Sequence, residues 1–178
     1  MENRYHHKLK LPVAFVPKDL NIEIPSHIKY KVSDVNQDLI DFLKSLGVSV
    51  IASEVFARPA GTDGGTHLDG AVETAATKIN YVYGQGTMNW HQLKPGKKLY
   101  EYHTAINTMY LYSMAVDNEI VWSANIDETG SLVNVGGLHS VTDITTPRIC
   151  YCLMLGDMAK NNTSLQWDRA IELFKGYY

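Results

Sequence analysis

The sequence predicts a mainly β protein, a β-sandwich or jelly-roll-like barrel with flanking α-helices. From residue 48 to about 156 the chain shows short β-rich runs separated by Gly, Asn and Asp turns. One helical pattern precedes these runs, over about 34–46, and a second follows them, over about 164–175. A length of 178 residues fits one domain, 1–178, with a single core. The order of helix, many strands and helix favours a barrel that encloses a ligand cavity.

The first helix is predicted from a capping signal and one apolar face. Asp34 can cap it, with Gln37 three residues later as in a capping box, and Gly47 can end it. The second helix has the same capping signal at Thr163 and Gln166. The apolar face of the first helix comprises Val35, Leu39, Ile40, Phe42, Leu43 and Leu46.

The β-rich runs are separated by turn residues. Residues 1–32 look extended, and the run 48–58 is stopped by Pro59. Residues 76–93 are interpreted as a hairpin that turns at Gly84 to Gly86. Further strand-like runs cover residues 102–114, 119–126, 131–141 and 147–155.

The composition argues against several classes of partner. Charged residues make up 20% of the chain and the net charge is -3, which argues against nucleic acid. No run approaches the ~20 apolar residues of a transmembrane helix, and the first residues lack the apolar core of a signal peptide. We therefore expect a cytoplasmic protein with no membrane partner and an oligomeric state that the sequence leaves open. Cys150 and Cys152 are expected to be buried free thiols, as a reducing compartment permits.

The stretch PAGTDGGTHLDG places His67 and Asp69 two positions apart, where the chain leaves a Gly-rich loop. On a strand, residues i and i+2 face the same side, so the imidazole and the carboxylate can meet at one point. His139, in another strand-like run, is the candidate third ligand. Two His and one carboxylate form the ligand set of non-haem Fe(II) sites. The pair could equally be a hydrogen-bonded strand start, and His91 and His103 are rival ligands.

Arg148 opens the run RICYCLML and shares a strand face with Cys150 and Cys152. A guanidinium group among apolar neighbours is costly to bury without a partner. Its planar fork of donors matches a carboxylate, which it can bind through two hydrogen bonds. Either a protein acid, Asp143 or Asp157, or the carboxylate of a ligand can supply that partner.

The order His67-x-Asp69, His139 and Arg148 resembles the signature of the Fe(II)- and 2-oxoglutarate-dependent oxygenase superfamily. The segment LHSVTDITTPRICYCLML is similar to the end of that family's core, where the last His is followed by a turn and an Arg-bearing strand. TKINYVYGQGTMNWHQL is similar to the strands after the first motif in small prolyl-hydroxylase-like or aspartyl/asparaginyl-hydroxylase-like members. The resemblance covers about residues 48–156. It implies a double-stranded β-helix, the jelly-roll or cupin-like barrel.

The resemblance also implies an activity and its site. The chain would be a dioxygenase that uses Fe(II), 2-oxoglutarate and O2, and releases succinate and CO2 while hydroxylating a small molecule or a peptide side chain. Arg148 would pair with the C5 carboxylate of 2-oxoglutarate, and Asn80 and Lys78 are further candidates for contact with the co-substrate. The implied metal ligands, which are also the catalytic residues, are His67, Asp69 and His139.

Two rival functions stay open at the level of the sequence. A cupin-like metalloenzyme would keep the metal ligands but would not need Arg148 to bind 2-oxoglutarate. A jelly-roll binding protein without catalysis would need neither. The same ligands can also bind Ni, Zn, Mn or Co in place of iron.

Overall fold

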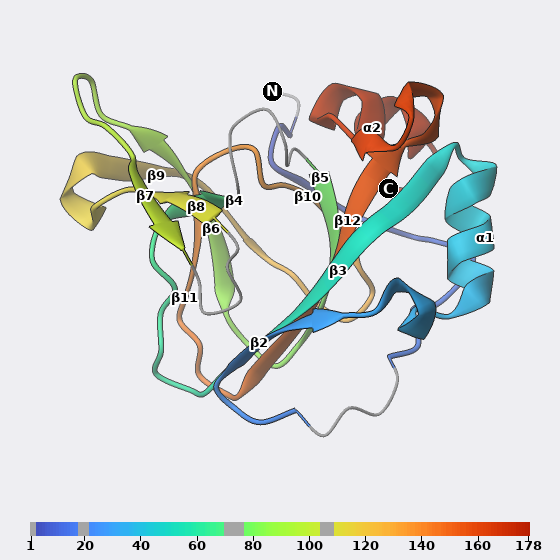
Figure 1. Cartoon of the computed structure of the whole chain (residues 1–178). Helices are drawn as coiled ribbons and strands as arrows, with labels where there is room; N and C mark the ends of the chain where they lie inside the picture. Colours follow the sequence, from blue (N-terminus) through green and yellow to red (C-terminus); the bar gives the residue numbers. More distant parts are fainter. Residues whose placement is uncertain (1–2, 18–21, 70–76, 104–108) are drawn as a thin grey trace.

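The computed structural model describes residues 3–17, 22–69, 77–103 and 109–178, and shows two β-sheets with two α-helices (Figure 1). Within the described residues, one sheet has seven strands in the order β1-β10-β5-β12-β3-β2, with β13 paired to β12. These strands are β1 His6–Lys8, β2 Ser26–Tyr30, β3 Val48–Arg58, β5 Thr77–Tyr83, β10 Ser131–Asn134, β12 Arg148–Asp157 and β13 Thr163–Ser164.

The second sheet has six strands among the described residues, in the order β7-β8-β4-β11-β6-β9. All strand pairs in both sheets are antiparallel, so the predicted mainly β class is confirmed. These strands are β4 His67–Asp69, β6 Thr87–Leu93, β7 Tyr100–His103, β8 Met109–Tyr112, β9 Asn118–Asn125 and β11 His139–Thr142.

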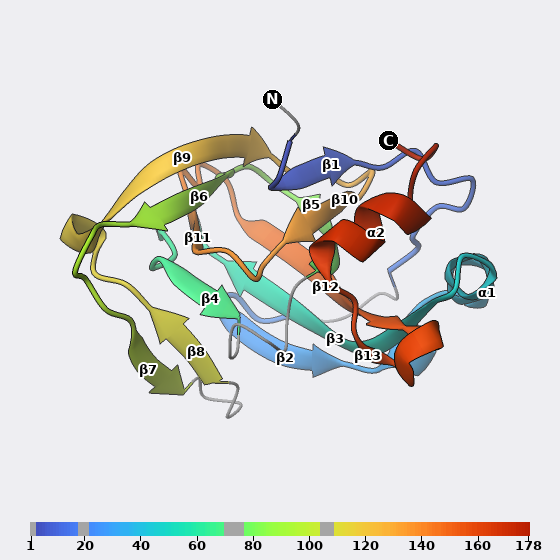
Figure 2. The same cartoon turned by 90° about the horizontal axis from the view of Figure 1, so that it is seen from above.

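The two sheets lie face to face, and both helices cover the outer face of the seven-stranded sheet (Figure 2). Helix α1 Gln37–Ser45 and helix α2 Trp167–Leu173 bury Leu39, Leu43 and Ala170 in the apolar core between the helices and this sheet. Leu153, on β12, lies in the same core and is fully buried. Burial of such side chains stabilises a fold by about 25 cal/mol per Å² of apolar surface, so the helices are integral to it.

A second apolar cluster fills part of the space between the sheets. Val82, Cys150 and Cys152 come from the seven-stranded sheet, and Met88 and Trp90 come from the six-stranded sheet. Strand β12 therefore contacts both layers, with alternate side chains pointing to the helices and to the other sheet. The predicted division of this strand into two faces is confirmed.

The predicted hairpin over residues 76–93 is wrong. Strand β5 pairs with β10 and β12, whereas β6 pairs with β9 and β11 in the other sheet. The segment Gly84 to Gly86 thus carries the chain from one sheet to the other. Gly84 has a φ of +96°, and a Cβ at this position would collide with the carbonyl oxygen of Pro147. The glycines here permit a close crossing of two chain segments, which a turn pattern alone does not distinguish from a hairpin.

Both helices begin later than predicted. Asp34 lies in a short 3-10 turn, Val32–Asp34, and the cap of α1 is Asn36, whose side chain makes no capping hydrogen bond. Thr163 belongs to β13, where pairing with β12 competes with the predicted capping box, and α2 follows Gln166. The end of α1 is as expected, because Gly47 adopts a φ of +79° directly after Leu46.

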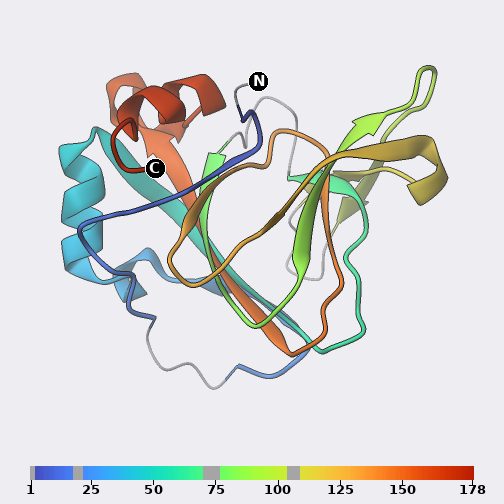
Figure 3. The same cartoon turned by 180° about the vertical axis from the view of Figure 1, so that it is seen from behind.

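The sheets also extend beyond the predicted core of 48–156. Strands β1, β2 and β13 pair outside that range, so part of the extended N-terminal segment completes the edges of the larger sheet. Strand β1 lies beside the C-terminal residues, where the rings of His7 and Tyr178 are 4.2 Å apart (Figure 3). Among the described residues, no helix is both long and apolar enough to span a membrane.

The crossing at Gly84 gives a stability prediction. We expect Gly84→Ala to lower the free energy of unfolding by roughly 2–4 kcal/mol, because the new Cβ meets a backbone carbonyl in a strained conformation. Gly96→Ala is the matched control, since Gly96 has a φ of +77° but open space around a Cβ, and should lose only about 1 kcal/mol. Urea denaturation measures both, and equal losses would contradict the proposed close crossing.

Candidate metal centre

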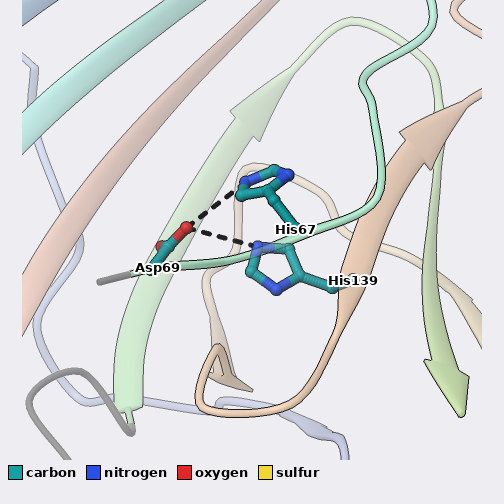
Figure 4. Close-up of side chains that lie close together, drawn as sticks. All are labelled: His67, Asp69 and His139. Atoms are coloured by element: carbon teal, nitrogen blue, oxygen red, sulfur yellow. Dashed lines mark ion pairs between the residues drawn. The ribbon is translucent and has the colours of Figure 1, made fainter. Parts of the chain in front are cut away.

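The structure brings His67, Asp69 and His139 together on the inner face of the six-stranded sheet (Figure 4). Strands β4 and β11 are neighbours, and His67 and His139 are directly paired across them. The Nε2 atom of His67 lies 3.3 Å from Asp69 Oδ1, and the Nε2 atom of His139 lies 3.6 Å from the same oxygen. The ligand atoms of the three residues all lie within 4.8 Å of one another, which suits a single metal ion.

Both histidine rings are held in one orientation by the backbone. The Nδ1 atom of His67 is 2.7 Å from the carbonyl oxygen of Gly65, and that of His139 is 3.0 Å from the carbonyl oxygen of Gly137. A carbonyl can only accept a hydrogen bond, so each Nδ1 carries the proton. In the neutral imidazole the Nε2 lone pair is then free for a metal on the side of the ring that faces Asp69, which is how ligand histidines are oriented in metal sites.

Asp69 also contacts the opposite sheet through its second carboxylate oxygen. Oδ2 lies 2.6 Å from the Nζ atom of Lys78 on β5, and both side chains are buried. Burial alone would raise the pKa of Asp69, but Lys78, His139 and His67 together hold it well below its usual value. Asp69 is therefore an anion with one oxygen paired to a cation and the other free for a metal.

Lys78 was expected as a contact for the co-substrate, and the structure gives it this other partner. Burial would lower its pKa, but the charge of Asp69 outweighs burial and raises the pKa above its usual value. The ammonium group is thus already paired within the protein. A role for Lys78 in binding the co-substrate stays a prediction.

Burial keeps His139 neutral near pH 7. Burial is the main cause that lowers its pKa to about 4, and the neighbouring His67 lowers it further. A metal binds the unprotonated nitrogen, so an imidazole that stays neutral near pH 7 is ready to act as a ligand.

The two rival histidines lie elsewhere. His91 Nε2 is 2.9 Å from the hydroxyl of Ser140, and His103 is exposed on β7. Neither joins the group of ligand atoms found among the described residues.

The candidate metal group opens into a cavity of about 850 Å³ that both sheets line. Arg148 and Asn80, expected to face such a cavity, both line it and are buried. Five buried polar atoms of residues in its wall have no hydrogen-bond partner among the described residues: Arg148 Nε, Asn80 Oδ1, Tyr110 Oη, Ser26 Oγ and His27 Nε2. Unpaired buried polar groups are rare in folded proteins, and groups that face a cavity are those that a ligand can satisfy.

Neither protein acid considered for Arg148 pairs with it. Asp157 lies at the far end of β12, where its carboxylate is 3.9 Å from Arg169. Asp143 interacts with the hydroxyl of Thr142, and no ion pair joins it to Arg148 among the described residues. Of the two kinds of partner that the sequence left open, the described residues therefore do not provide the protein acid.

Two more residues line the cavity: Arg58, which the sequence patterns did not identify, and Tyr110, for which the sequence favours a place in the core and leaves a place in a substrate pocket open. Arg58 is the last residue of β3 and is directly paired with Arg148 on β12. Tyr110 is paired with Asp69 across β8 and β4. Arg58 and Glu54 are four residues apart on one strand, so the sequence places both side chains on the same face. The pairing of this strand with one that lies ninety residues further along the chain could not be predicted from the sequence.

Cys150 and Cys152 line the same cavity as free thiols, with their sulfur atoms 3.5 Å apart. The hydrogen bond from Cys152, together with the charges of Arg148 and Lys78, lowers the pKa of Cys150 to about 7 against the opposing effect of burial. The expectation of buried, unbridged thiols is confirmed.

Comparison with known proteins adds little to this geometry. No protein-family model matches the sequence, and no curated protein matches it. One solved structure to which the chain is similar is described as "Non-heme monooxygenase, ThoJ-Ni complex". The match has a TM-score of 0.35 and 14% sequence identity, and it covers 69% of this chain and 53% of that one. The chain thus spans about half the length of that protein, and a likeness at this level establishes neither a shared fold nor a shared activity.

The geometry predicts which histidine a metal needs. We expect His139→Ala to weaken binding of Mn(II) or Co(II) at least ~100-fold, because loss of a ligand should exceed the ~10–100-fold effect of losing a supporting contact. His91→Ala is the control, since His91 bonds Ser140 instead, and should bind the metal normally. Isothermal calorimetry on the full chain measures both, and equal affinities would contradict the assignment.

The buried pair of Lys78 and Asp69 predicts a coupling between metal and stability. In the metal-free protein, Lys78→Met should lower the free energy of unfolding by about 3–5 kcal/mol, because it leaves a buried carboxylate without its cation. Lys97→Met, which removes an exposed lysine from its pair with Asp117, should change stability little. Saturating Mn(II) should restore most of the loss in Lys78→Met, and thermal unfolding with and without the metal tests this.

Proposed function

We propose that this protein is an Fe(II)- and 2-oxoglutarate-dependent dioxygenase that hydroxylates a small molecule or a peptide side chain. One observation carries the proposal. A group able to bind a metal shares a cavity with Arg148, a buried arginine that no acid of the described residues neutralises. A metal site and an unpaired guanidinium group are the two features that chelation and charge pairing of a 2-oxoacid require.

The strand order supports a double-stranded β-helix as the fold behind this proposal. In chain order, β3, β4, β5 and β6 alternate between the two sheets, and so do β9, β10, β11 and β12. The central strands stand as β10-β5-β12-β3 in one sheet and β4-β11-β6-β9 in the other. Two antiparallel sheets linked by such crossings are the arrangement of a jelly roll.

The residues fit the metal and the co-substrate in donor type. His67, Asp69 and His139 would hold Fe(II), leaving further coordination positions open. When bound, the iron supplies the redox chemistry by which O2 oxidises 2-oxoglutarate to succinate and CO2 and the substrate is hydroxylated. Arg148 would pair with the C5 carboxylate, and its orphaned Nε atom is the donor that this contact would satisfy.

The chain's own residues prepare this site before any ligand binds. Lys78 keeps Asp69 ionised and fixes one of its oxygens, while the carbonyls of Gly65 and Gly137 fix the histidine rings. Such preorganisation spares the cost of reorienting ligands when the metal arrives.

The test is anaerobic addition of Fe(II) and then 2-oxoglutarate, followed by visible absorption. We expect a weak charge-transfer band in the wild type and none in His139→Ala. Arg148→Gln should weaken the binding of 2-oxoglutarate by about 10–100-fold, because this is the contribution of a hydrogen-bonded charge pair to affinity. Arg169→Gln, on the surface helix, should leave it unchanged.

Other outcomes would replace the proposal. Iron binding without the band, and without an effect of Arg148→Gln, would favour a cupin-like metalloenzyme that does not use 2-oxoglutarate. Failure to bind iron at all would favour a jelly-roll binding protein, in which His67 and Asp69 only begin a strand.

A further inference from the structure

The cavity holds two arginines side by side. Arg58 and Arg148 are directly paired across β3 and β12, so their side chains leave the same face of the sheet. Both line the cavity, Arg148 is buried and Arg58 is half-buried. Burial lowers the pKa of Arg58, and so does the positive charge of Arg148, which places the two guanidinium groups within electrostatic reach.

No protein acid neutralises this pair among the described residues. Asp69 is used by Lys78, and the carboxylate of Glu54 lies 3.4 Å from His27 Nε2. Glu101 lines the cavity but is exposed to solvent on β7. Like charges in a partly desolvated site repel one another and favour the binding of anions.

One co-substrate cannot neutralise both arginines. In the proposed function, 2-oxoglutarate places one carboxylate on the metal and presents the other to Arg148. One negative charge then faces two guanidinium groups. A second anionic group is therefore needed to neutralise Arg58. The cavity, with a volume of about 850 Å³, has room for a second small molecule.

The rest of the wall suits an apolar body. Phe56, on β3, lies two residues before Arg58 on the same strand face and is stacked on His27 at 4.1 Å. Met88, Val135 and Tyr112 also line the cavity, from other strands and loops. An acid that is anionic at one end and apolar at the other would satisfy both parts of this wall.

We propose that Arg58 binds the carboxylate of the primary substrate, and that this substrate is a small organic acid with an apolar body. The proposal rests on the proposed function, in which Arg148 binds the co-substrate. Arg58 is thus a substrate-binding and specificity-determining residue. Its Nη2 atom lies beside Gly64, where a Cβ would make an ordinary van der Waals contact with it at 3.6 Å.

The experiment compares a charged probe with its neutral analogue. The full chain is loaded with Mn(II) and saturating 2-oxoglutarate under anaerobic conditions, and calorimetry follows the binding of C4 to C9 monocarboxylates, including 3-phenylpropanoate, and of their primary amides. We expect at least one acid to bind about tenfold more tightly than its amide, the worth of one charged hydrogen bond. Arg58→Gln should abolish this preference, and Arg58→Lys should retain part of it.

Binding of 2-oxoglutarate to the same variants separates the two proposals. Arg58→Gln should change its affinity less than about threefold, whereas Arg148→Gln should weaken it much more. If Arg58→Gln weakens the binding of 2-oxoglutarate as strongly as Arg148→Gln does, both arginines bind the co-substrate and the inference about Arg58 is wrong. It is also wrong if no acid binds better than its amide.

Failure of the proposed function gives a different pattern. Suppose that 2-oxoglutarate does not bind the wild-type protein, but acids still bind better than amides in a way that depends on Arg58. The anion site at Arg58 is then supported, and the proposed dioxygenase activity is contradicted. Circular dichroism and thermal unfolding of each variant confirm that the fold is retained. Arg58→Lys then shows whether the charge or the shape of the side chain is needed.

Discussion

The buried ion pair between Lys78 and Asp69 is the interaction on which the candidate site depends. This ion pair joins the two sheets, because Lys78 belongs to β5 in one sheet and Asp69 to β4 in the other. The pair fixes one carboxylate oxygen and so turns the other toward the two histidines. A buried pair of this kind contributes little net stability, but breaking it is expensive, so it constrains the geometry of the site more than it strengthens the fold.

The sequence predicted the residues of the metal group because each carries a local signal. His67 and Asp69 are two apart on a strand, and His139 follows a turn before a second strand. The structure adds that each histidine also follows a glycine by two positions, Gly65 and Gly137, whose carbonyls orient the rings. That repeated Gly-x-His spacing was present in the sequence, but only the backbone geometry gives it a purpose.

Other features could not be predicted from local patterns. The helix starts at Asp34 and Thr163 were wrong because capping residues serve short turns and strands as readily as helices. The hairpin at Gly84 was wrong because glycines also permit a close crossing between sheets. Arg58 was missed because its significance comes from Arg148, which lies ninety residues further along the chain.

The alternation of strands between the sheets has a consequence for how the protein folds. The pairings that build the site join segments far apart in sequence, such as His67 with His139 and Arg58 with Arg148. Chains dominated by such non-local pairing fold slowly, since the entropy of closing long loops is lost before the contacts form. A partly folded chain thus has no candidate metal site, and a metal that binds there selects the completed fold over every earlier state.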